Sequence, residues 1–166
     1  MNDTKSRTRQ LKQVIRDFVQ NDSGDEILEF ARKDRRTIQI LTRMTYDKKS
    51  DLGRKAIHIL GKTIGTLVRD DYDYAREVVR TLLWSANDES GGFGCAVPEI
   101  LGEAIRETPE SFLDIVPLIF TLYEDDIFQA GALYAIARIG ERRPHVVEKA
   151  RPLIKAGLNS EDAEIR

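Results

Sequence analysis

Apolar residues recur every three or four positions along almost the whole chain, which is the pattern of amphipathic helices. In residues 4–20, for example, Leu11, Ile15 and Phe18 fall on one helix face. The same spacing continues in eight further segments: 23–33, 35–44, 54–68, 74–84, 96–105, 109–123, 128–140 and 145–158. No segment alternates apolar and polar residues for long enough to indicate a strand. The pattern therefore predicts an all-α protein.

Residues that favour helix starts stand at the beginning of several segments. Ser23 is a predicted N-cap, and the acids that follow it fall in a first turn, where the helix dipole favours negative charge. Thr108 before Pro109 predicts a capped start with proline at the first helical position. Pro98 has no N–H to donate and belongs in a first turn, so its helix is expected to begin late, around residues 93–95.

Two markers repeat along the chain with a period near 37 residues. Four aspartates stand 37, 38 and 36 residues apart, at Asp51, Asp88, Asp126 and Asp162. Thirteen residues after each of the first three, an apolar residue precedes a glycine, at 64–65, 101–102 and 139–140. Such a period with two helices per unit is typical of helical solenoids, in which each hairpin buries its apolar face only against its neighbours.

At this point the chain resembles a known family. Residues 115–141, IVPLIFTLYEDDIFQAGALYAIARIGE, look like a HEAT repeat, and residues 150–166, ARPLIKAGLNSEDAEIR, repeat its proline and acidic turn. The resemblance covers residues 34–166 and implies a right-handed α-solenoid of HEAT-like helical hairpins, a fold used mostly to bind proteins. It divides one domain into an N-terminal cap, three repeats and a partial repeat: 1–33, 34–69, 70–107, 108–142 and 143–166.

The tandem pattern also predicts the core. First helices of the hairpins are expected to present inward Ile38, Leu41, Val78, Val79, Leu82, Ile115, Val116 and Ile119. Second helices are expected to pack against them with Ile57, Leu60, Ile100, Leu101, Leu133, Ile136 and Ile139. Small residues let neighbouring helices approach closely, and they include Gly131, Ala132 and Ala135.

Composition places the protein among soluble helical proteins with charged outer faces, because 41% of its residues are hydrophobic and 33% are charged. Cys95 is the only cysteine, so an internal disulfide is excluded and a cytoplasmic location is expected. No run of apolar residues approaches the roughly 18 that a membrane span needs, and no secretory signal is recognisable.

The net charge of −2 conceals an asymmetry. Residues 1–70 carry 16 Lys+Arg against 10 Asp+Glu, whereas residues 71–166 carry 10 against 18. A basic half could attract phosphate or an acidic partner, although solvated outer helix faces explain the same charges. Asp34 interrupts the basic run at 32–36, and the sequence pI near 5.8 also weighs against nucleic acid as a partner.

Residues for catalysis or metal binding are sparse. His58 and His145 lie 87 residues apart, and no His or Cys pair has metal-ligand spacing. Ser90 stands in neither a nucleophile turn nor a P-loop, and Cys95 is interpreted as a small packed residue. The sequence therefore predicts no catalytic residue, no metal and no cofactor.

The stretch NDESGGFG at 87–94 departs from the helix-starting pattern of the other repeats. Its glycines and acids have two interpretations, a structural turn whose acids cap the following helix or a loop that contacts a ligand or partner. Because the departure calls for a local reason, we predict a contact. The residues assigned to it are Asn87, Asp88, Glu89, Ser90, Gly91 and Gly92, with Trp84 just upstream.

Three function classes follow from this sequence. The first is a non-catalytic scaffold that binds an unidentified protein in a groove lined by second helices, with exposed His58, Lys62, Glu99, Glu103, Tyr134 and Arg138. The second is an enzyme accessory that handles a cofactor or partner, as in phycobilisome bilin lyases. The third is a nucleic-acid reader similar to HEAT-like alkylpurine glycosylases, which the acidic C-terminal half disfavours. The sequence favours the scaffold.

The C-terminal end is expected to leave apolar residues uncovered. The helix at 145–158 lacks a full second helix, because only EDAEIR follows the acidic turn. Val147, Leu153 or Ile154 would then be partly exposed, since a solenoid needs a polar cap over its last apolar face. Self-association or partner binding is predicted there, unless further residues follow residue 166.

Overall fold

The computed structural model describes residues 2–87 and 96–166, with side chains from residue 7 onward. Its α-helices are α1 (Asn2–Gln20), α2 (Gly24–Lys33), α3 (Arg36–Met44), α4 (Asp51–Leu67), α5 (Tyr72–Ala86), α6 (Val97–Glu107), α7 (Val116–Leu122), α8 (Gln129–Arg142) and α9 (Arg151–Leu158). Three 3-10 helices connect the later elements, η1 (Pro109–Ser111), η2 (Leu113–Ile115) and η3 (Pro144–Ala150). The described residues contain no strand, which confirms the all-α prediction.

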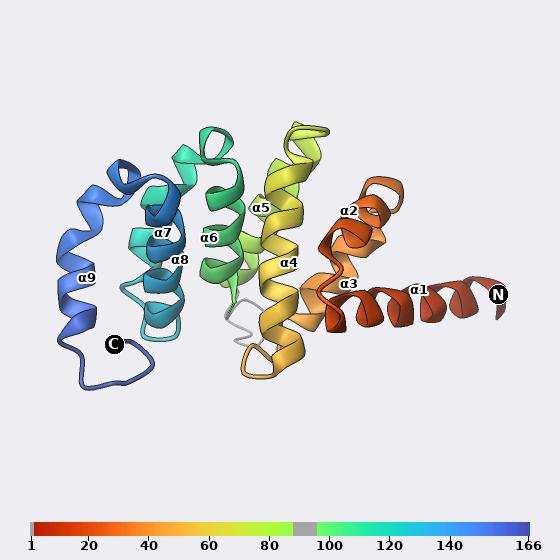
Figure 1. Ribbon diagram of the computed structural model, residues 1–166, viewed down its shortest axis with the longest axis horizontal. Helices are drawn as coiled ribbons and strands as arrows, with labels where there is room; N and C mark the ends of the chain where they lie inside the picture. Colours follow the sequence, from red (N-terminus) through yellow and green to blue (C-terminus); the bar gives the residue numbers. More distant parts are fainter. Residues whose placement is uncertain (1, 88–95) are drawn as a thin grey trace.

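The helices form a row rather than a ball. Figure 1 shows α4, α6 and α8 side by side in the middle of the molecule, with α1–α3 at one end and α9 at the other. Helix α1 extends away from the row toward the N-terminus. No helix in the described residues is long and apolar enough to cross a membrane.

Glycines set the close contacts between the three central helices. A Cβ on Gly65 of α4 would lie 2.6 Å from the Glu107 Cβ and 2.7 Å from the Ala104 carbonyl oxygen of α6. A Cβ on Gly102 of α6 would lie 2.5 Å from the Ala135 Cα of α8. Such approaches are possible only without a side chain. The glycines at 65 and 102 therefore mark contacts between helices.

The predicted core is confirmed almost completely. The expected inward residues of both helix types are buried, apart from Val78 and Leu133, which are half-buried. The core runs continuously from Ile15 of α1 to Ala150 at the end of η3. Burial of this apolar surface is the main stabilising contribution in a helical stack.

Ser23 and Thr108 occupy the predicted N-cap positions of α2 and η1, and Pro109 is the first residue of η1. The capping itself is wrong, because neither side chain accepts a capping hydrogen bond. The buried Thr108 hydroxyl instead donates to the Gly65 carbonyl oxygen at 2.6 Å, which joins the end of α6 to α4. The hydroxyl therefore takes part in a long-range hydrogen bond instead of a local capping bond. Pro98 does lie in the first turn of α6, but that helix begins at Val97.

The aspartate markers do not occupy one equivalent position. Asp51 is the first residue of α4, Asp126 lies in the turn before α8, and Asp162 lies in a C-terminal turn that does not open a helix. Asp88 lies outside the described residues. The start of each helix is stabilised differently: the Ser50 hydroxyl accepts from the Gly53 N–H at α4, whereas the N-cap of α8, Phe128, has no side-chain capping bond.

The C-terminal expectation is correct for some residues and wrong for one. Val147 is buried, whereas Leu153 is half-buried and Ile154 is exposed. Leu158 is more open still, at 64% exposed. Val147 is covered because η3 packs against α8, a contact that the sequence pattern did not reveal.

Candidate functional site on α4, α6 and α8

Glu103 is a carboxylate buried between the three central helices. It lies in the middle of α6, and only 1% of its side chain is exposed. Gly61 of α4 packs directly on its Cβ, and α8 covers it from the other side. The sequence predicted an exposed groove residue here, which is wrong. How deeply the Glu103 side chain is buried depends on how closely α4 and α8 approach.

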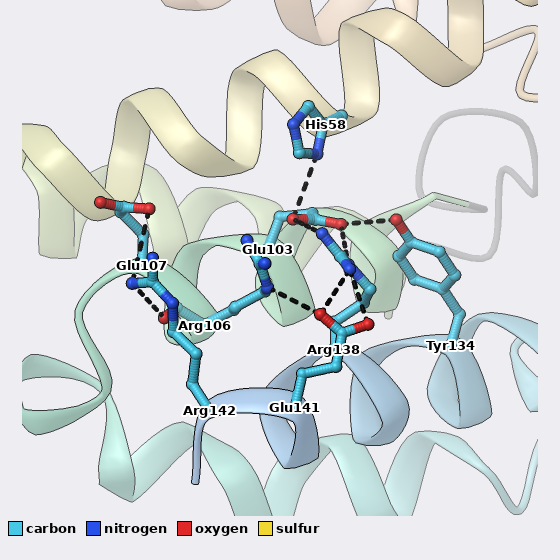
Figure 2. A network of polar contacts seen from close by, with 8 residues as sticks. All are labelled: His58, Glu103, Arg106, Glu107, Tyr134, Arg138, Glu141 and Arg142. Carbon is cyan, nitrogen blue, oxygen red and sulfur yellow. Dashed lines mark hydrogen bonds and ion pairs between the residues drawn. The ribbon is translucent and has the colours of Figure 1, made fainter.

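Polar groups from both neighbouring helices converge on this carboxylate, as Figure 2 shows. The His58 Nδ1 of α4 lies 3.2 Å from Oε2. From α8, the Tyr134 hydroxyl donates to Oε1 at 2.5 Å and the Arg138 Nε donates to Oε1 at 2.6 Å. A second guanidinium nitrogen of Arg138 reaches Oε2 at 3.3 Å. Glu103 therefore connects three helices.

These contacts determine the charge of Glu103. Burial by itself opposes ionisation, but hydrogen bonds from His58, Arg138 and Tyr134 together outweigh it and lower the pKa from 4.5 to about 2. Burial and the same carboxylate raise the pKa of Tyr134. The Glu103 hydrogen bond also raises the pKa of Arg138. At neutral pH Glu103 is an anion that is too weak a base for efficient proton abstraction.

The network continues toward the C-terminal ends of α6 and α8 (Figure 2). The Arg138 guanidinium also binds the Glu141 carboxylate at 2.7 Å, and Arg106 reaches Glu141 at 3.1 Å. A longer pair joins Arg142 to Glu107 at 3.9 Å. Charges on this face are therefore largely matched within the protein, and their side chains are held in place.

Glu99, one turn before Glu103, is a second carboxylate with restricted surroundings. Its Oε1 accepts from the Lys48 Nζ at 3.1 Å, while its buried Oε2 has no hydrogen-bond partner among the described residues. A Cβ on Gly131 would lie 2.5 Å from that oxygen. Glu99 and Tyr134 line a cavity of about 380 Å³ together with Lys48, Lys49, Ile57, Arg54, Ala130 and Glu164.

The structure brings together most of the residues predicted for the groove. His58, Glu103, Tyr134 and Arg138 are in contact, and Glu99 lies beside Tyr134 in the cavity. Lys62 points elsewhere: it is half-exposed and pairs with Asp25 of α2 at 3.7 Å. The residues predicted for the groove thus form a cluster whose centre, Glu103, is buried, and a role of this cluster in binding stays a prediction.

The predicted loop contact falls mostly on residues that the structure does not describe. Asp88, Glu89, Ser90, Gly91 and Gly92 lie outside the described residues. Upstream of them, Trp84 is 79% exposed near the end of α5. Asn87 caps the same helix, and its side-chain amide donates to the Leu83 carbonyl oxygen at 3.0 Å.

Sequence reasoning missed a pocket between α3 and α5. Its volume is about 470 Å³, and it is lined by Arg35, Ile38, Gln39, Thr42, Arg43, Tyr46, Tyr74, Glu77, Val78, Thr81, Leu82 and Ser85. The Arg35 guanidinium lies over the Tyr74 ring, 4.2 Å from its centre. No motif marks this pocket, because its residues come from two helices whose spacing only the fold determines.

The described residues contain no group of three or more His, Cys, Asp or Glu side chains that could hold a metal ion. Comparisons with protein-family models, curated proteins and solved structures find no match to this chain. The residues of the chain itself must therefore support any functional conclusion.

Proposed function

We propose that this protein is a non-catalytic, HEAT-like helical scaffold that binds a partner protein on its α4–α6–α8 face. This face is defined by His58, Glu99, Glu103, Tyr134 and Arg138. The observation that carries the proposal is the buried Glu103 carboxylate, which fixes side chains from two neighbouring helices around it. The face is an ordered surface before any partner arrives.

Preordering favours binding because fewer side chains lose freedom when the complex forms. His58 keeps 49% of its side chain exposed, and Tyr134 is 40% exposed. Tyrosine and arginine are also among the residues that contribute most at protein interfaces. A partner could therefore contact Tyr134 and His58 without disturbing the buried carboxylate that holds them.

A regular separation of polar contacts supports the HEAT-like part of the proposal. Arg32 binds Asp70 and Arg76 binds Asp114, and both pairs span 38 residues. The Arg69 side chain reaches the Glu107 carbonyl oxygen, again across 38 residues. Other polar contacts between neighbouring segments span 33 to 36 residues, as in the pairs Arg143–Glu110, Arg106–Glu141 and Arg35–Asp71. A stack of hairpins of similar length produces separations in such a narrow range.

Site-specific photocrosslinking tests the proposed face. A benzophenone amino acid would replace Tyr134 or His58, and a matched control would carry it at Leu118, an exposed α7 residue. In extracts of the native cell, we expect one discrete protein to be crosslinked from 134 and 58 and not from 118. Equal labelling from all three positions, or none from 134 and 58, would contradict the proposal.

A loss-of-binding variant completes this test with the purified partner. Tyr134→Phe removes the hydroxyl that binds Glu103 but keeps the ring, whereas Tyr134→Ala removes the contact surface. We expect Tyr134→Ala to weaken partner binding more than Tyr134→Phe, while unfolding measured by circular dichroism verifies that both variants are folded. Unchanged affinity in folded Tyr134→Ala would contradict this role.

Self-association at the C-terminal end is a second part of the proposal, supported by the exposed Ile154 and Leu158 side chains. Light scattering across a concentration series should detect dimers that Leu158→Lys abolishes. A strict monomer at all concentrations would remove this part and leave the α4–α6–α8 face unaffected.

The pocket between α3 and α5 supports one alternative function, an accessory protein that handles a small organic molecule. Its volume of about 470 Å³ falls within the range of ligand sites, and Tyr46 and Tyr74 provide aromatic walls. Titration with a linear tetrapyrrole, followed by its absorption spectrum, tests this alternative. A spectral change that Tyr74→Ala abolishes would favour it over the scaffold.

A further inference from the structure

A hollow of about 300 Å³ between α1 and α3 is lined by four cations. Arg9, Lys12 and Arg16 come from α1, and Arg43 comes from α3. The remaining lining residues are Gln13, Ile40 and Met44. No carboxylate is among these lining residues. This hollow lies on other helices than the α4–α6–α8 face.

These four cations differ from most others on the protein because none forms an ion pair with a residue that the structure describes. Elsewhere, arginines bind carboxylates of neighbouring segments: Arg32 of α2 binds Asp70 in the turn after α4, and Arg76 of α5 binds Asp114 of η2. All four side chains in the hollow are also exposed. Like charges gathered in one hollow repel one another, so the arrangement adds no stability by itself. An anionic ligand would relieve that repulsion.

The spacing of the cations fits an extended acidic segment. Arg9 and Arg16 are two helical turns apart, which is about 10 Å along α1. Alternate residues of an extended chain face the same side, so two carboxylates four positions apart lie on one face, roughly 13–14 Å apart, with the residue midway between them. The long arginine side chains cover the remaining difference of about 3 Å, so these two carboxylates could meet both arginines. Ile40 and Met44 provide an apolar surface for an aliphatic side chain between the acids.

Nucleic acid fits the hollow less well. The lining residues given above include no aromatic ring on which a base could stack. Asp17 stands one turn from Gln13 and accepts from its side-chain amide at 2.9 Å; this negative charge opposes any anion and does not distinguish nucleic acid from an acidic peptide. A phosphate backbone would also need a longer basic surface than four side chains, because each contact contributes separately. A short peptide needs only this hollow.

We infer that the hollow formed by Arg9, Lys12, Arg16 and Arg43 is a binding site for a short acidic segment of a partner protein, with an aliphatic residue between its carboxylates. The site does not depend on the α4–α6–α8 face. A partner that engages both surfaces would bind more tightly than through either one, because the second contact is intramolecular.

Fluorescence anisotropy with a labelled GEELLEEG peptide tests the site on the whole protein. The control peptide GQQLLQQG has the same shape without charge. We expect binding of GEELLEEG only, weakened by added salt because exposed charges are screened. The double variant Arg16→Gln/Arg43→Gln should raise Kd by about tenfold, as expected when charges at a complementary surface are removed.

A matched control variant separates this site from general attraction to a basic protein. Arg80→Gln/Lys155→Gln removes two exposed cations that also form no ion pair with the described residues. We expect this variant to change Kd by less than about twofold, since both positions lie outside the hollow. Equal weakening in the two double variants would overturn the site, as would binding of GQQLLQQG with the same affinity as GEELLEEG.

Two competitors test the nature of the occupant. Tighter binding of a 20-base-pair DNA duplex than of GEELLEEG would overturn the peptide assignment in favour of nucleic acid. Tighter binding of LNSEDAEIR, residues 158–166 of this chain, than of GEELLEEG would overturn the assignment to a partner protein. The occupant would then be a second copy of this chain. Failure of GEELLEEG to bind at low salt would overturn the site itself. None of these results bears on crosslinking at the α4–α6–α8 face.

Discussion

The α4–α6–α8 face and the α1–α3 hollow use charge in opposite ways. On the face, Glu103 is buried and receives hydrogen bonds from His58, Tyr134 and Arg138. In the hollow, four exposed cations from α1 and α3 have no carboxylate among the described residues to pair with. Charges of the first kind hold neighbouring helices in a fixed arrangement. Charges of the second kind remain available for a ligand.

This difference shows that charged residues at two proposed binding surfaces can have different tasks: a buried charge orders the side chains around it, and exposed unpaired charges attract the ligand directly. The sequence located His58, Glu103, Tyr134 and Arg138 as a group, but their central carboxylate is satisfied inside the protein. The hollow has no comparable internal partner. Substitutions of the buried Glu103 and of the cations in the hollow should therefore affect stability and binding in opposite proportions, and the following experiments measure their effects on stability.

The largest expected effect is on Glu103. Glu103→Ala leaves Arg138 and Tyr134 without the carboxylate that they share, and breaking a buried charged cluster in this way costs about 3–5 kcal/mol of unfolding free energy. Glu103→Gln keeps the shape and some hydrogen bonds, so its cost should be smaller. Urea denaturation measures both.

The control for this change is Glu141→Gln. Glu141 also binds Arg138, but it is exposed, so its loss should cost less than about 1 kcal/mol. Equal destabilisation by Glu103→Ala and Glu141→Gln would show that Glu103 is no more important than a surface charge.

Acid should reproduce part of the Glu103 effect. Its pKa is lowered from 4.5 to about 2, so the folded state binds a proton less readily than the unfolded chain. The stability that Glu103 contributes is fully present above pH 4.5 and is lost as the pH falls toward 2. The loss should be on the order of 3 kcal/mol.

Comparing two pH series isolates this contribution from the other acids. Unfolding free energies of the wild type and of Glu103→Gln should converge between pH 4.5 and pH 2. If the two curves remain parallel across this range, the ionisation of Glu103 does not stabilise the fold.

The third effect concerns the close approach that buries this region. Gly65→Ala places a Cβ 2.6 Å from the Glu107 Cβ and 2.7 Å from the Ala104 carbonyl oxygen, so α4 and α6 must move apart. Overpacking costs about 1–3 kcal/mol, and alanine returns up to about 1 kcal/mol of helix propensity. A net destabilisation is expected in thermal or urea unfolding.

Gly24→Ala is its matched control, because the nearest atom to a new Cβ, the Ile59 Cγ1, lies 3.9 Å away. That variant should be neutral or up to about 1 kcal/mol more stable. If Gly65→Ala proves as stable as Gly24→Ala, α4 and α6 do not pack as closely as described.

The smallest expected effect is in the hollow. Arg16→Gln/Arg43→Gln removes two charges that repel the neighbouring cations, and it breaks no ion pair. The unfolding free energy should therefore change by no more than about 0.5 kcal/mol. The same variant is expected to lose affinity for an acidic peptide. A destabilisation comparable to that of Glu103→Ala would instead show that these cations hold α1 and α3 in place.

Local periodicity explains how much of this protein could be read from its sequence. Leu60, Ile100 and Ile136 were assigned to the core because apolar spacing follows the helical repeat, and all three are buried. The glycines at 65 and 102 were recognised as recurring markers, and they do lie at helix contacts. Such features depend on residues a few positions apart, so sequence alone was sufficient.

The sequence by itself thus determined the all-α class, the inward faces of the helices and the group of polar residues around His58. Only the tertiary structure decided that Glu103 is buried, that the Thr108 hydroxyl binds the Gly65 carbonyl oxygen, and which cations lack an ion pair. The reason is that these contacts join residues more than 30 positions apart. Their existence depends on the distance between neighbouring helices, which close packing of many side chains fixes and no local pattern encodes.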